Sequence, residues 1–321
     1  MTARLLPVLS QDAQRPLVLA ASTGGHLAEL IRLAPGLGAA DDSLWITFRT
    51  PQSESLLRNR NVLFAPYVRP RDGRTVVQAF RQILPAIRKA NYQAAVSTGA
   101  ALALAALPAA RMAGLPSLYV ESVCRVTGPS LSGRILAKLR FAEMRTQHAA
   151  WAGGCWGTHP SVLSTYRTVP RNAVPAAPRK LFVTVGTLRG YTFSALIERI
   201  CALGLANEDT VWQIGDTRPP GELPGKVYRE MSAEDFERYA TEADAVVCHA
   251  GVGTVLCLFE LGVSPVAVVR RAGRGEHVDD HQQQLGQLMR ETGVGFPVEL
   301  EELTREVVRA ASTTRTSRLE A

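Results

Sequence analysis

Four short segments rich in glycine and small polar residues follow apolar runs of the kind that form buried strands. Each opens a helical stretch, and a helix N-terminus presents free N–H groups and a partial positive charge. Glycine also lets the backbone approach a phosphate closely. One such segment is often only a tight turn, but four of them predict ligand binding. They are Ser22-Thr23-Gly24-Gly25-His26, Ser97-Thr98-Gly99, Gly186-Thr187 and His249-Ala250-Gly251-Val252-Gly253-Thr254.

A fifth polar cluster lies in the stretch RRAGRGEHVDDHQQQL, residues 270–285. Two histidines and three carboxylates this close together are compatible with a metal site, although His277 and His281 lack the H-E-x-x-H pattern. A helix start capped by an aspartate explains the same residues. We therefore expect polar contacts with a ligand and no bound metal. The cluster consists of Glu276, His277, Asp279, Asp280, His281 and Gln282.

Two further residues have the chemistry of a general base. Glu121 ends the apolar run SLYVE and precedes Arg125, so it is either a base at a strand end or a surface carboxylate paired with an arginine. His26 opens a helix, where the dipole disfavours the imidazolium form. It is therefore expected to act as a neutral base or as a hydrogen-bond donor.

Alternating strands and helices must position these residues. In the first half, strand-like runs at 16–22, 43–50, 61–67, 94–99 and 116–122 are separated by helical stretches at 26–37, 53–59, 75–90 and 100–114. In the second half, strand-like runs at 180–187, 209–216, 244–254 and 264–271 alternate with helical stretches at 193–204, 232–243, 255–262 and 278–293. Continuous apolar runs in this alternation predict parallel sheets with helices on both faces.

We therefore expect an α/β protein with two doubly wound domains. Residues 1–166 would form the first domain, the proline- and arginine-rich stretch 167–179 a linker, and residues 180–321 the second domain. The polar tail STTRTSRLEA is expected to fray. Ligands of such folds bind at the carboxyl ends of the strands, here in a cleft between the domains.

The composition narrows the classes of partner. With 46% hydrophobic and 20% charged residues, the chain has the balance of a soluble globular protein. Residues 1–178 hold 20 Lys and Arg against 8 Asp and Glu, whereas residues 179–321 hold 16 against 21. Only the first half is thus expected to meet an anionic surface. Nucleic acid is disfavoured, because no aromatic residues are interleaved with the basic ones.

The cysteines and the apolar segments indicate the cellular compartment of the protein. Five cysteines show no C-x-x-C pair or metal-ligand spacing, which is typical of buried free thiols in a reducing compartment. The N-terminus has no signal-peptide pattern, and the most apolar segment, residues 100–110, is too short to span a bilayer. We expect a cytoplasmic protein that contacts the inner face of the plasma membrane only peripherally.

Several motifs carry a family resemblance. STGGHLAEL, VSTGAALALAAL and YVESVCRVTGPSLSGRIL resemble the acceptor half of the two-subunit glycosyltransferases that act on dolichol- or polyprenyl-pyrophosphate sugars. LFVTVGT, CHAGVGT, VVRR and GEHVDDHQ resemble the donor half, with a glycosyltransferase family 28 C-terminal domain, in the bacterial exopolysaccharide form. Both halves occur here in one chain, as in the peptidoglycan enzyme MurG. The resemblance covers most of residues 16–295.

The resemblance implies a GT-B fold, in which two Rossmann-like domains face a cleft. It further implies a metal-independent, inverting hexosyltransferase that moves a sugar from UDP-GlcNAc or another UDP-hexose to a polyprenyl-pyrophosphate-linked acceptor. No cofactor is implied, since the UDP-sugar is a substrate. The implied donor-binding residues are Gly186, Thr187, His249, Ala250, Gly251, Gly253, Thr254, Glu276, His277, Asp280, His281 and Gln282.

The acceptor side is implied to lie in the first half. Glu121 and His26 match positions where a base is expected, and Arg125 follows the glutamate as it does in the family, where it would hold the lipid pyrophosphate. Thr23, Gly24, Gly25, Thr98 and Gly99 are the expected acceptor-binding residues. The basic residues Arg134, Lys138, Arg140 and Arg145 are expected on one helix that docks on an anionic membrane.

One departure leaves alternatives open. The family has a glutamate that can bind ribose hydroxyls in the helix after HAGVGT, where this chain has Cys257. The nucleotide is then bound differently, or weakly, or the protein is not a conventional UDP-sugar enzyme. The alternatives are a soluble glycosyltransferase of secondary metabolism and a non-catalytic nucleotide-sugar-binding protein.

Overall fold

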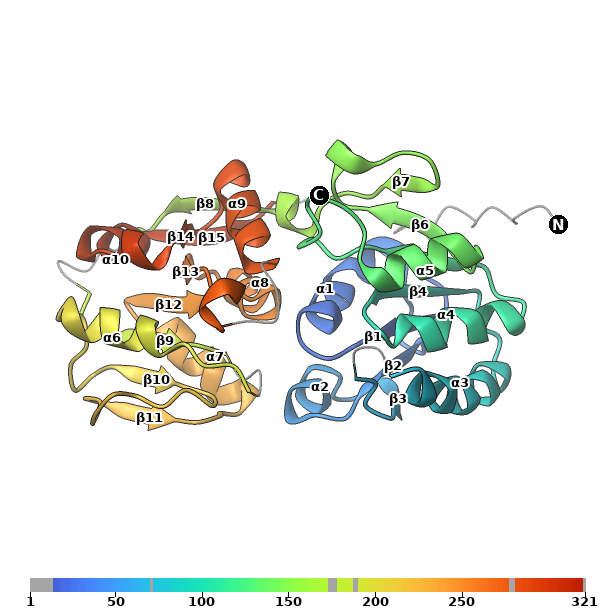
Figure 1. Cartoon of the computed structure of the whole chain (residues 1–321), viewed down its shortest axis with the longest axis horizontal. Coiled ribbons are helices and arrows are strands. Elements are labelled where there is room, and N and C mark those ends of the chain that lie inside the picture. The colour runs from blue at the N-terminus through green and yellow to red at the C-terminus, as the bar shows by residue number, and fades with distance from the viewer. Residues whose placement is uncertain (1–13, 70–71, 173–177, 187–189, 277–280, 320–321) are drawn as a thin grey trace. The chain divides into compact units, whose positions relative to one another are not determined.

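The protein consists of two compact units, Met1–Val162 and Leu163–Ala321, each of which is described by itself. The computed structural model describes residues 14–69, 72–172, 178–186, 190–276 and 281–319 (Figure 1). Each unit is built around its own parallel sheet with helices packed against it. This is the α/β class with two Rossmann-like domains that the sequence predicts.

The N-terminal sheet has seven parallel strands in the order β3-β2-β1-β4-β5-β6-β7. Because β4 pairs with β1 rather than with β3, the strand order reverses between β1 and β4, and this reversal marks a ligand-binding edge in open α/β sheets. The strands are β1 (Leu17–Ala21), β2 (Leu44–Phe48), β3 (Asn61–Ala65), β4 (Ala94–Gly99), β5 (Ser117–Val120), β6 (Glu143–Thr146) and β7 (Trp156–Thr158).

The helices of this unit cover both faces of the sheet. Val18 and Ala20 of β1 share a core with α3, α4 and α5, whereas Leu17 and Leu19 alternate to the opposite face. All five alanines of α4 are buried, and small side chains let this helix pack closely on the sheet. The helices are α1 (Gly25–Leu33), α2 (Pro51–Leu56), α3 (Gly73–Arg88), α4 (Ala103–Met112) and α5 (Leu131–Leu139).

The C-terminal sheet repeats this arrangement with six parallel strands in the order β11-β10-β9-β12-β13-β14. Here the strand order reverses between β9 and β12. The strands are β9 (Leu181–Thr184), β10 (Val211–Gln213), β11 (Lys226–Tyr228), β12 (Ala245–His249), β13 (Val266–Val268) and β14 (Phe296–Val298). The helices are α6 (Ser194–Ala202), α7 (Ala233–Glu242), α8 (Val252–Glu260), α9 (His281–Thr292) and α10 (Arg305–Ser312).

Two segments differ from the sequence prediction. β8 (Tyr166–Pro170), in the stretch expected to be a linker, pairs antiparallel with β15 (Thr314–Arg318), in the tail expected to fray. Thr316 of β15 is buried, and its hydroxyl donates to the Val263 carbonyl at 3.0 Å. The polar sequence of the tail therefore reflects a two-stranded ribbon that buries one hydroxyl, not a loose end.

Among the described residues, no helix is both long and apolar enough to cross a bilayer. The four basic residues expected together on one helix are also separated. Arg134 and Lys138 lie on α5, but Arg140 ends that helix in the left-handed conformation and Arg145 lies on β6. Arg145 pairs there with Glu143.

The ribbon formed by β8 and β15 is expected to stabilise the C-terminal unit. Thr316→Val removes a buried hydroxyl that bonds both the Val263 carbonyl and, at 3.1 Å, Ser264 Oγ. Leaving these groups without a partner should lower the free energy of unfolding by about 1–3 kcal/mol. Thermal unfolding followed by circular dichroism measures the loss, with Ser317→Ala as the control. Equal melting temperatures for Thr316→Val and the unchanged chain would contradict this assignment.

Candidate functional site

The carboxyl ends of β1 and β4 bring two of the predicted segments together. His26 is the second residue of α1, and its Nδ1 lies 2.8 Å from the Thr98 carbonyl, while Thr98 Oγ1 donates to the His26 carbonyl at 2.8 Å. The Ser22 amide donates to the Gly99 carbonyl at 3.1 Å. A carbonyl only accepts, so Nδ1 carries a proton and Nε2 is the accepting nitrogen of the neutral ring. This is the tautomer that a base or an acceptor-orienting histidine needs.

Glycine is required where these segments meet. Gly24 has φ +83° and precedes α1, and Gly99 has φ +108° at the end of β4. A Cβ on Gly99 would lie 3.1 Å from the Tyr119 hydroxyl and 3.2 Å from His26 Cε1. The absence of a side chain at Gly99 therefore allows the imidazole and the phenol to approach the same strand end. Thr23, Gly24 and Gly25 are half-buried, whereas Thr98 and Gly99 are buried.

Glu121 has no exposed surface and is fully hydrogen-bonded. Its Oε1 accepts from the Tyr119 hydroxyl at 3.0 Å and the Ser122 amide at 3.3 Å. Its Oε2 accepts from the Ser130 amide at 2.8 Å and the Ser130 hydroxyl at 2.9 Å. A base must reach a substrate proton, so this geometry does not support the expected role of Glu121 as a base. The carboxylate instead fixes the N-terminus of α5 against β5.

The close packing around Glu121 has two consequences. A Cβ on Gly133 would lie 2.5 Å from Glu121 Oε2, so α5 approaches the carboxylate through a glycine. Burial and the neighbouring Glu121 charge together raise the pKa of Tyr119 well above its usual range, which keeps the phenol a hydrogen-bond donor. Arg125 follows in a turn in which its amide donates to the Ser122 carbonyl at 2.9 Å, and its own side chain is half-buried.

Glu29, which the sequence analysis did not single out, is a second buried carboxylate beside this loop. It lies one turn after His26 on α1 and has no exposed surface. Its Oε1 accepts from the Val123 amide at 2.8 Å and from Gln147 Nε2. Within the described part of the chain, its Oε2 has no hydrogen-bond partner. Burial is the main cause that raises the pKa of Glu29 to about 7.

The carboxyl ends of β9 and β12 join two predicted segments of the C-terminal unit. The His249 ring packs over two glycines: a Cβ would lie 2.6 Å from His249 Cε1 at Gly186 and 2.3 Å from His249 Nε2 at Gly251. Gly251 precedes α8, whose first turn contains Gly253 and Thr254, and no side chain among the described residues caps this helix. Its amides therefore remain available to an anion. Thr187 lies outside the described residues.

The loop between β13 and α9 carries the fifth cluster, of which the structure describes only part. Glu276 Oε2 accepts from the Arg271 amide at 2.9 Å, and Gln282 Oε1 accepts from the Arg270 amide at 3.2 Å. Both side chains are buried and hold the loop in shape. His277, Asp280 and the side chain of His281 lie outside the described residues. In the described ranges, no group of three or more His, Cys, Asp or Glu is arranged to hold a metal.

Arg270, another residue that the sequence analysis did not single out, follows β13 with only 1% of its surface exposed. Its guanidinium donates to the Val185 carbonyl, next to Gly186, and lies 5.3 Å from the centre of the Phe193 ring. Burial lowers the pKa of Arg270 to about 10, and the nearby Glu276 charge opposes this change. Its signals in the sequence were its position directly after an apolar run and its place in the VVRR motif, which carries part of the family resemblance.

The sequence of this chain is similar to that of known glycosyltransferases. Residues 180–316 match the family model described as "Glycosyltransferase family 28 C-terminal domain". The chain is 25% identical over 317 residues to a UDP-N-acetylglucosamine–N-acetylmuramyl-(pentapeptide) pyrophosphoryl-undecaprenol N-acetylglucosamine transferase of Polaromonas sp. strain JS666, covering 90% of this chain and 80% of the relative.

Solved structures show the same fold. MurG of Acinetobacter baumannii has a TM-score of 0.55 at 21% identity and covers 92% of this chain and 89% of its own. The glycosyltransferase SnogD of Streptomyces nogalater has a TM-score of 0.56 at 19% identity, with 93% of each chain covered. The chain thus has the GT-B fold of two Rossmann-like domains.

The raised pKa of Glu29 predicts a pH-dependent stability. The folded pKa of about 7 exceeds the ordinary value of 4.5, so the folded state favours the protonated form, and stability is lost as the pH rises from about 4.5 through 7. Between these pH values the free energy of unfolding should fall by about 3 kcal/mol. Glu29→Gln should remove most of this pH dependence. Denaturant unfolding at pH 5, 6, 7 and 8 measures it, with the exposed Asp42→Asn as control. Parallel pH curves for the unchanged chain and Glu29→Gln would refute this assignment.

The packing of His249 predicts a coupled pair of substitutions. Gly251 has φ −89°, which alanine adopts easily, so Gly251→Ala should destabilise only by displacing the His249 ring, by about 1–3 kcal/mol. His249→Ala in the same chain should recover most of the loss. Gly273→Ala is the matched control, because a Cβ there meets nothing within 4 Å. Thermal unfolding of the unchanged chain, Gly251→Ala, His249→Ala, the double variant and Gly273→Ala tests the coupling, which additive losses for the two single variants would disprove.

Proposed function

We propose that this protein is an inverting glycosyltransferase that moves a sugar from a UDP-sugar, UDP-GlcNAc or another UDP-hexose, to a polyprenyl-pyrophosphate-linked sugar acceptor. The observation that carries the proposal is the position of the family 28 match. It includes the ends of β9, β12 and β13, where His249, two glycines and the uncapped N-terminus of α8 come together. Polyprenyl-linked acceptors are named for the curated relatives, which act on a pyrophosphoryl-undecaprenol substrate.

The C-terminal unit would hold the donor. The first amides of α8 suit a diphosphate, because they are N–H donors without intrahelical partners beside the His249 ring, which packs over Gly186 and Gly251. Glu276, His277, Asp280, His281 and Gln282 would contact the donor sugar and phosphates. Backbone and arginine donors would stabilise the leaving UDP without a bound metal.

The N-terminal unit would hold the acceptor. The acceptor hydroxyl would lose its proton to His26, whose Nδ1 is fixed by the Thr98 carbonyl and whose Nε2 can accept. Thr23, Gly24, Gly25 and Gly99 would lie beside the pyrophosphate or sugar, with Arg125 in the adjacent loop. Glu121 would position this loop through α5 rather than act on the substrate.

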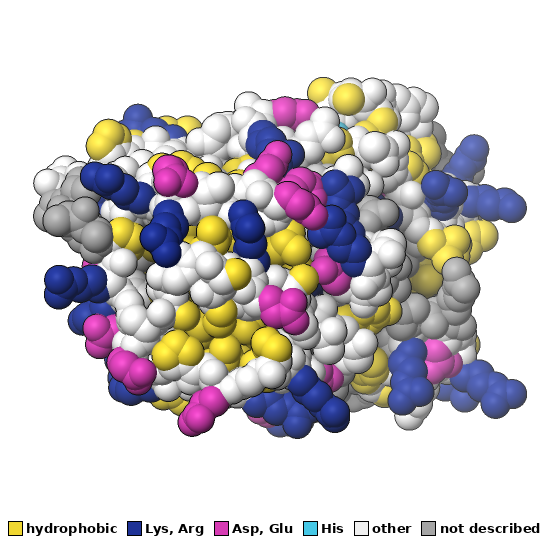
Figure 2. Space-filling model, turned by 60° about the vertical axis from the view of Figure 1, so that its left-hand side comes forward, with side chains coloured by type: hydrophobic (Ala, Val, Ile, Leu, Met, Phe, Trp, Pro, Cys, Tyr) yellow, Lys and Arg dark blue, Asp and Glu magenta, His cyan; other side chains and the backbone are white. Residues whose placement is uncertain are grey.

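A peripheral contact with an anionic membrane fits the helices of the N-terminal unit. Leu131 and Leu139 of α5 are 61% and 54% exposed, and they flank Arg134 and Lys138 on the same helix. Met112 of α4 is 59% exposed as well. Exposed apolar side chains beside basic ones are typical of surfaces that insert into a lipid headgroup region. On the face drawn in Figure 2, by contrast, Lys and Arg are interspersed with Asp and Glu.

The protein would thus work at the cytoplasmic face of the membrane in the synthesis of a cell-surface polysaccharide. Transfer is tested with radiolabelled UDP-sugars and a bacterial lipid extract, in which label should move into the organic phase. UDP binding without transfer would favour a non-catalytic sugar-nucleotide-binding protein. Transfer to soluble acceptors alone would favour a glycosyltransferase of secondary metabolism.

The role of His26 predicts a separation of transfer from donor binding. His26→Ala should lower kcat by roughly a hundredfold or more, while the Kd for UDP stays unchanged. His26→Asn is the matched variant, because its amide can still donate to the Thr98 carbonyl but offers no base. Both variants should have a similarly low kcat. A fully active His26→Asn would show that His26 only orients the backbone.

A further inference from the structure

Both polar groups of the Val123 backbone are held by side chains from other elements of the N-terminal unit. Val123 lies in the loop between β5 and α5, and its amide donates to Glu29 Oε1 of α1 at 2.8 Å. The Val123 carbonyl lies 2.6 Å from Nε2 of His148, which follows β6. A carbonyl only accepts, so this nitrogen of His148 carries a proton. The two side chains thus fix the amide and the carbonyl of one loop residue.

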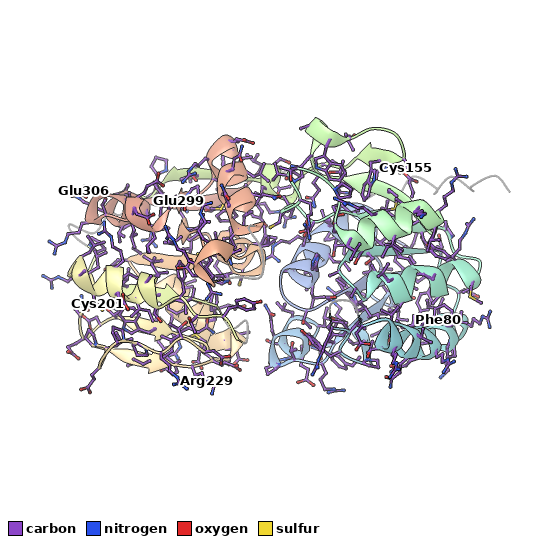
Figure 3. All side chains as sticks on the ribbon, in the orientation of Figure 1. Phe80, Cys155, Cys201, Arg229, Glu299 and Glu306 are labelled. Carbon is purple, nitrogen blue, oxygen red and sulfur yellow. The ribbon has the colours of Figure 1, made fainter. Side chains whose placement is uncertain are left out.

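The segment between β6 and β7 holds the same loop at two further points. Gln147 Nε2 donates to the Glu121 carbonyl at 3.0 Å. Trp151 Nε1 donates to the Arg125 carbonyl at 2.8 Å. The segment ends at Cys155, directly before β7 (Figure 3). The backbone of the loop is therefore fixed from outside on both sides of its centre.

Glu29 is buried in surroundings that favour its neutral form. Its Oε1 already accepts from the Val123 amide and from Gln147, and its Oε2 has no hydrogen-bond partner in the described part of the chain. The proton of the neutral carboxyl therefore belongs on Oε2. Ionisation would leave a buried negative oxygen without a donor, which costs more than a neutral hydroxyl in the same place.

Three elements place titratable or charged groups near Glu29. They are His26 and Arg32 of α1, Glu121 and Arg125 of the loop between β5 and α5, and His148 after β6. The Glu121 charge adds to the effect of burial, and both raise the pKa of Glu29, which is about 7. Hydrogen bonds from the loop and from Gln147 oppose these two effects without cancelling them. Glu29 therefore changes its charge near neutral pH.

We propose that Glu29 and His148 are positioning residues that set the loop bearing Arg125 for acceptor binding, and that this loop loosens when Glu29 ionises. The inference rests on the proposed function, which assigns the loop to the acceptor. The cost of the buried charge falls if the loop moves away from α1 and water reaches Oε2, so ionisation and loop opening are coupled. The affinity for the acceptor then falls with the fraction of protein whose loop is closed.

Loop opening is tested by hydrogen–deuterium exchange of the full chain at pD 6 and pD 8, expressed as protection factors. These factors correct for the intrinsic effect of pH on amide exchange. In the unchanged chain, residues 122–126 should lose protection by about fivefold or more at pD 8, where about nine tenths of Glu29 is ionised. Glu29→Gln, which mimics the neutral carboxyl, should keep equal protection at both values. Asp42→Asn, at an exposed carboxylate of the same unit, should behave like the unchanged chain.

Acceptor use is tested with radiolabelled UDP-sugars and a bacterial lipid extract at pH 6 and pH 8. For the unchanged chain, the apparent KM for the acceptor lipid should rise by up to about tenfold at pH 8, while the KM for the UDP-sugar stays within about twofold. Glu29→Gln should keep one acceptor KM at both pH values. His148→Phe, which cannot donate to the Val123 carbonyl, should raise the acceptor KM at pH 6 by roughly tenfold. His148→Gln, whose Nε2 can still donate, should restore it.

An equal loss of protection with pD in the unchanged chain and in Glu29→Gln would overturn the inference. An acceptor KM that is the same at pH 6 and pH 8 in the unchanged chain, or a His148→Gln variant as impaired as His148→Phe, would overturn it as well and leave the proposed function intact. Absence of transfer at both pH values would instead overturn the proposed function, and the role in acceptor binding with it. If Glu29→Gln does not fold by circular dichroism, the unchanged chain and the two His148 variants decide the matter.

Discussion

Parallel strand pairing is the constraint on which the rest of this structure depends. Both sheets are parallel throughout, and their central strands are buried on both faces, so these strands carry mainly apolar side chains. Polar chemistry is thereby confined to the ends of the strands, and all carboxyl ends of one sheet lie at one edge together with the N-termini of the following helices. The two reversal points, β1 with β4 and β9 with β12, each place a histidine against a glycine at this edge.

The carboxyl-end edges of the two sheets differ in the charged side chains that are buried beside them. In the N-terminal unit, Glu121 and Glu29 lie beneath the β5–α5 loop, and the loop is held by amides that donate to their carboxylates. In the C-terminal unit, the buried charged side chains among the described residues are the cation of Arg270 and the nearby carboxylate of Glu276. Acidic groups that accept hydrogen bonds from a loop and a buried guanidinium beside one carboxylate have different uses. The first gives rigidity to the β5–α5 loop, which the proposed function assigns to the acceptor, and the second would suit an anionic ligand.

The strand ends could be predicted from the sequence because apolar runs and glycine-rich junctions are local signals. The contact of His26 with Thr98, and that of His249 with Gly186, follow once two junctions belong to neighbouring parallel strands. The burial of Glu121 could not be predicted, since it depends on α5 folding back so that Ser130 and Gly133 meet the carboxylate. The ribbon of β8 and β15 joins segments far apart in the chain, and a polar strand has no hydrophobic period to reveal it.

Hydrogen–deuterium exchange of the full chain with and without UDP tests most directly whether the donor binds at the reversal point of the C-terminal sheet. The account predicts that UDP slows amide exchange most strongly at the start of α8, over residues 251–256, and at the Arg270 and Arg271 amides. Strongest protection at residues 22–30 and 97–99 would place the nucleotide in the N-terminal unit and contradict the account. Amide exchange that is unchanged by UDP at every residue would also contradict the account.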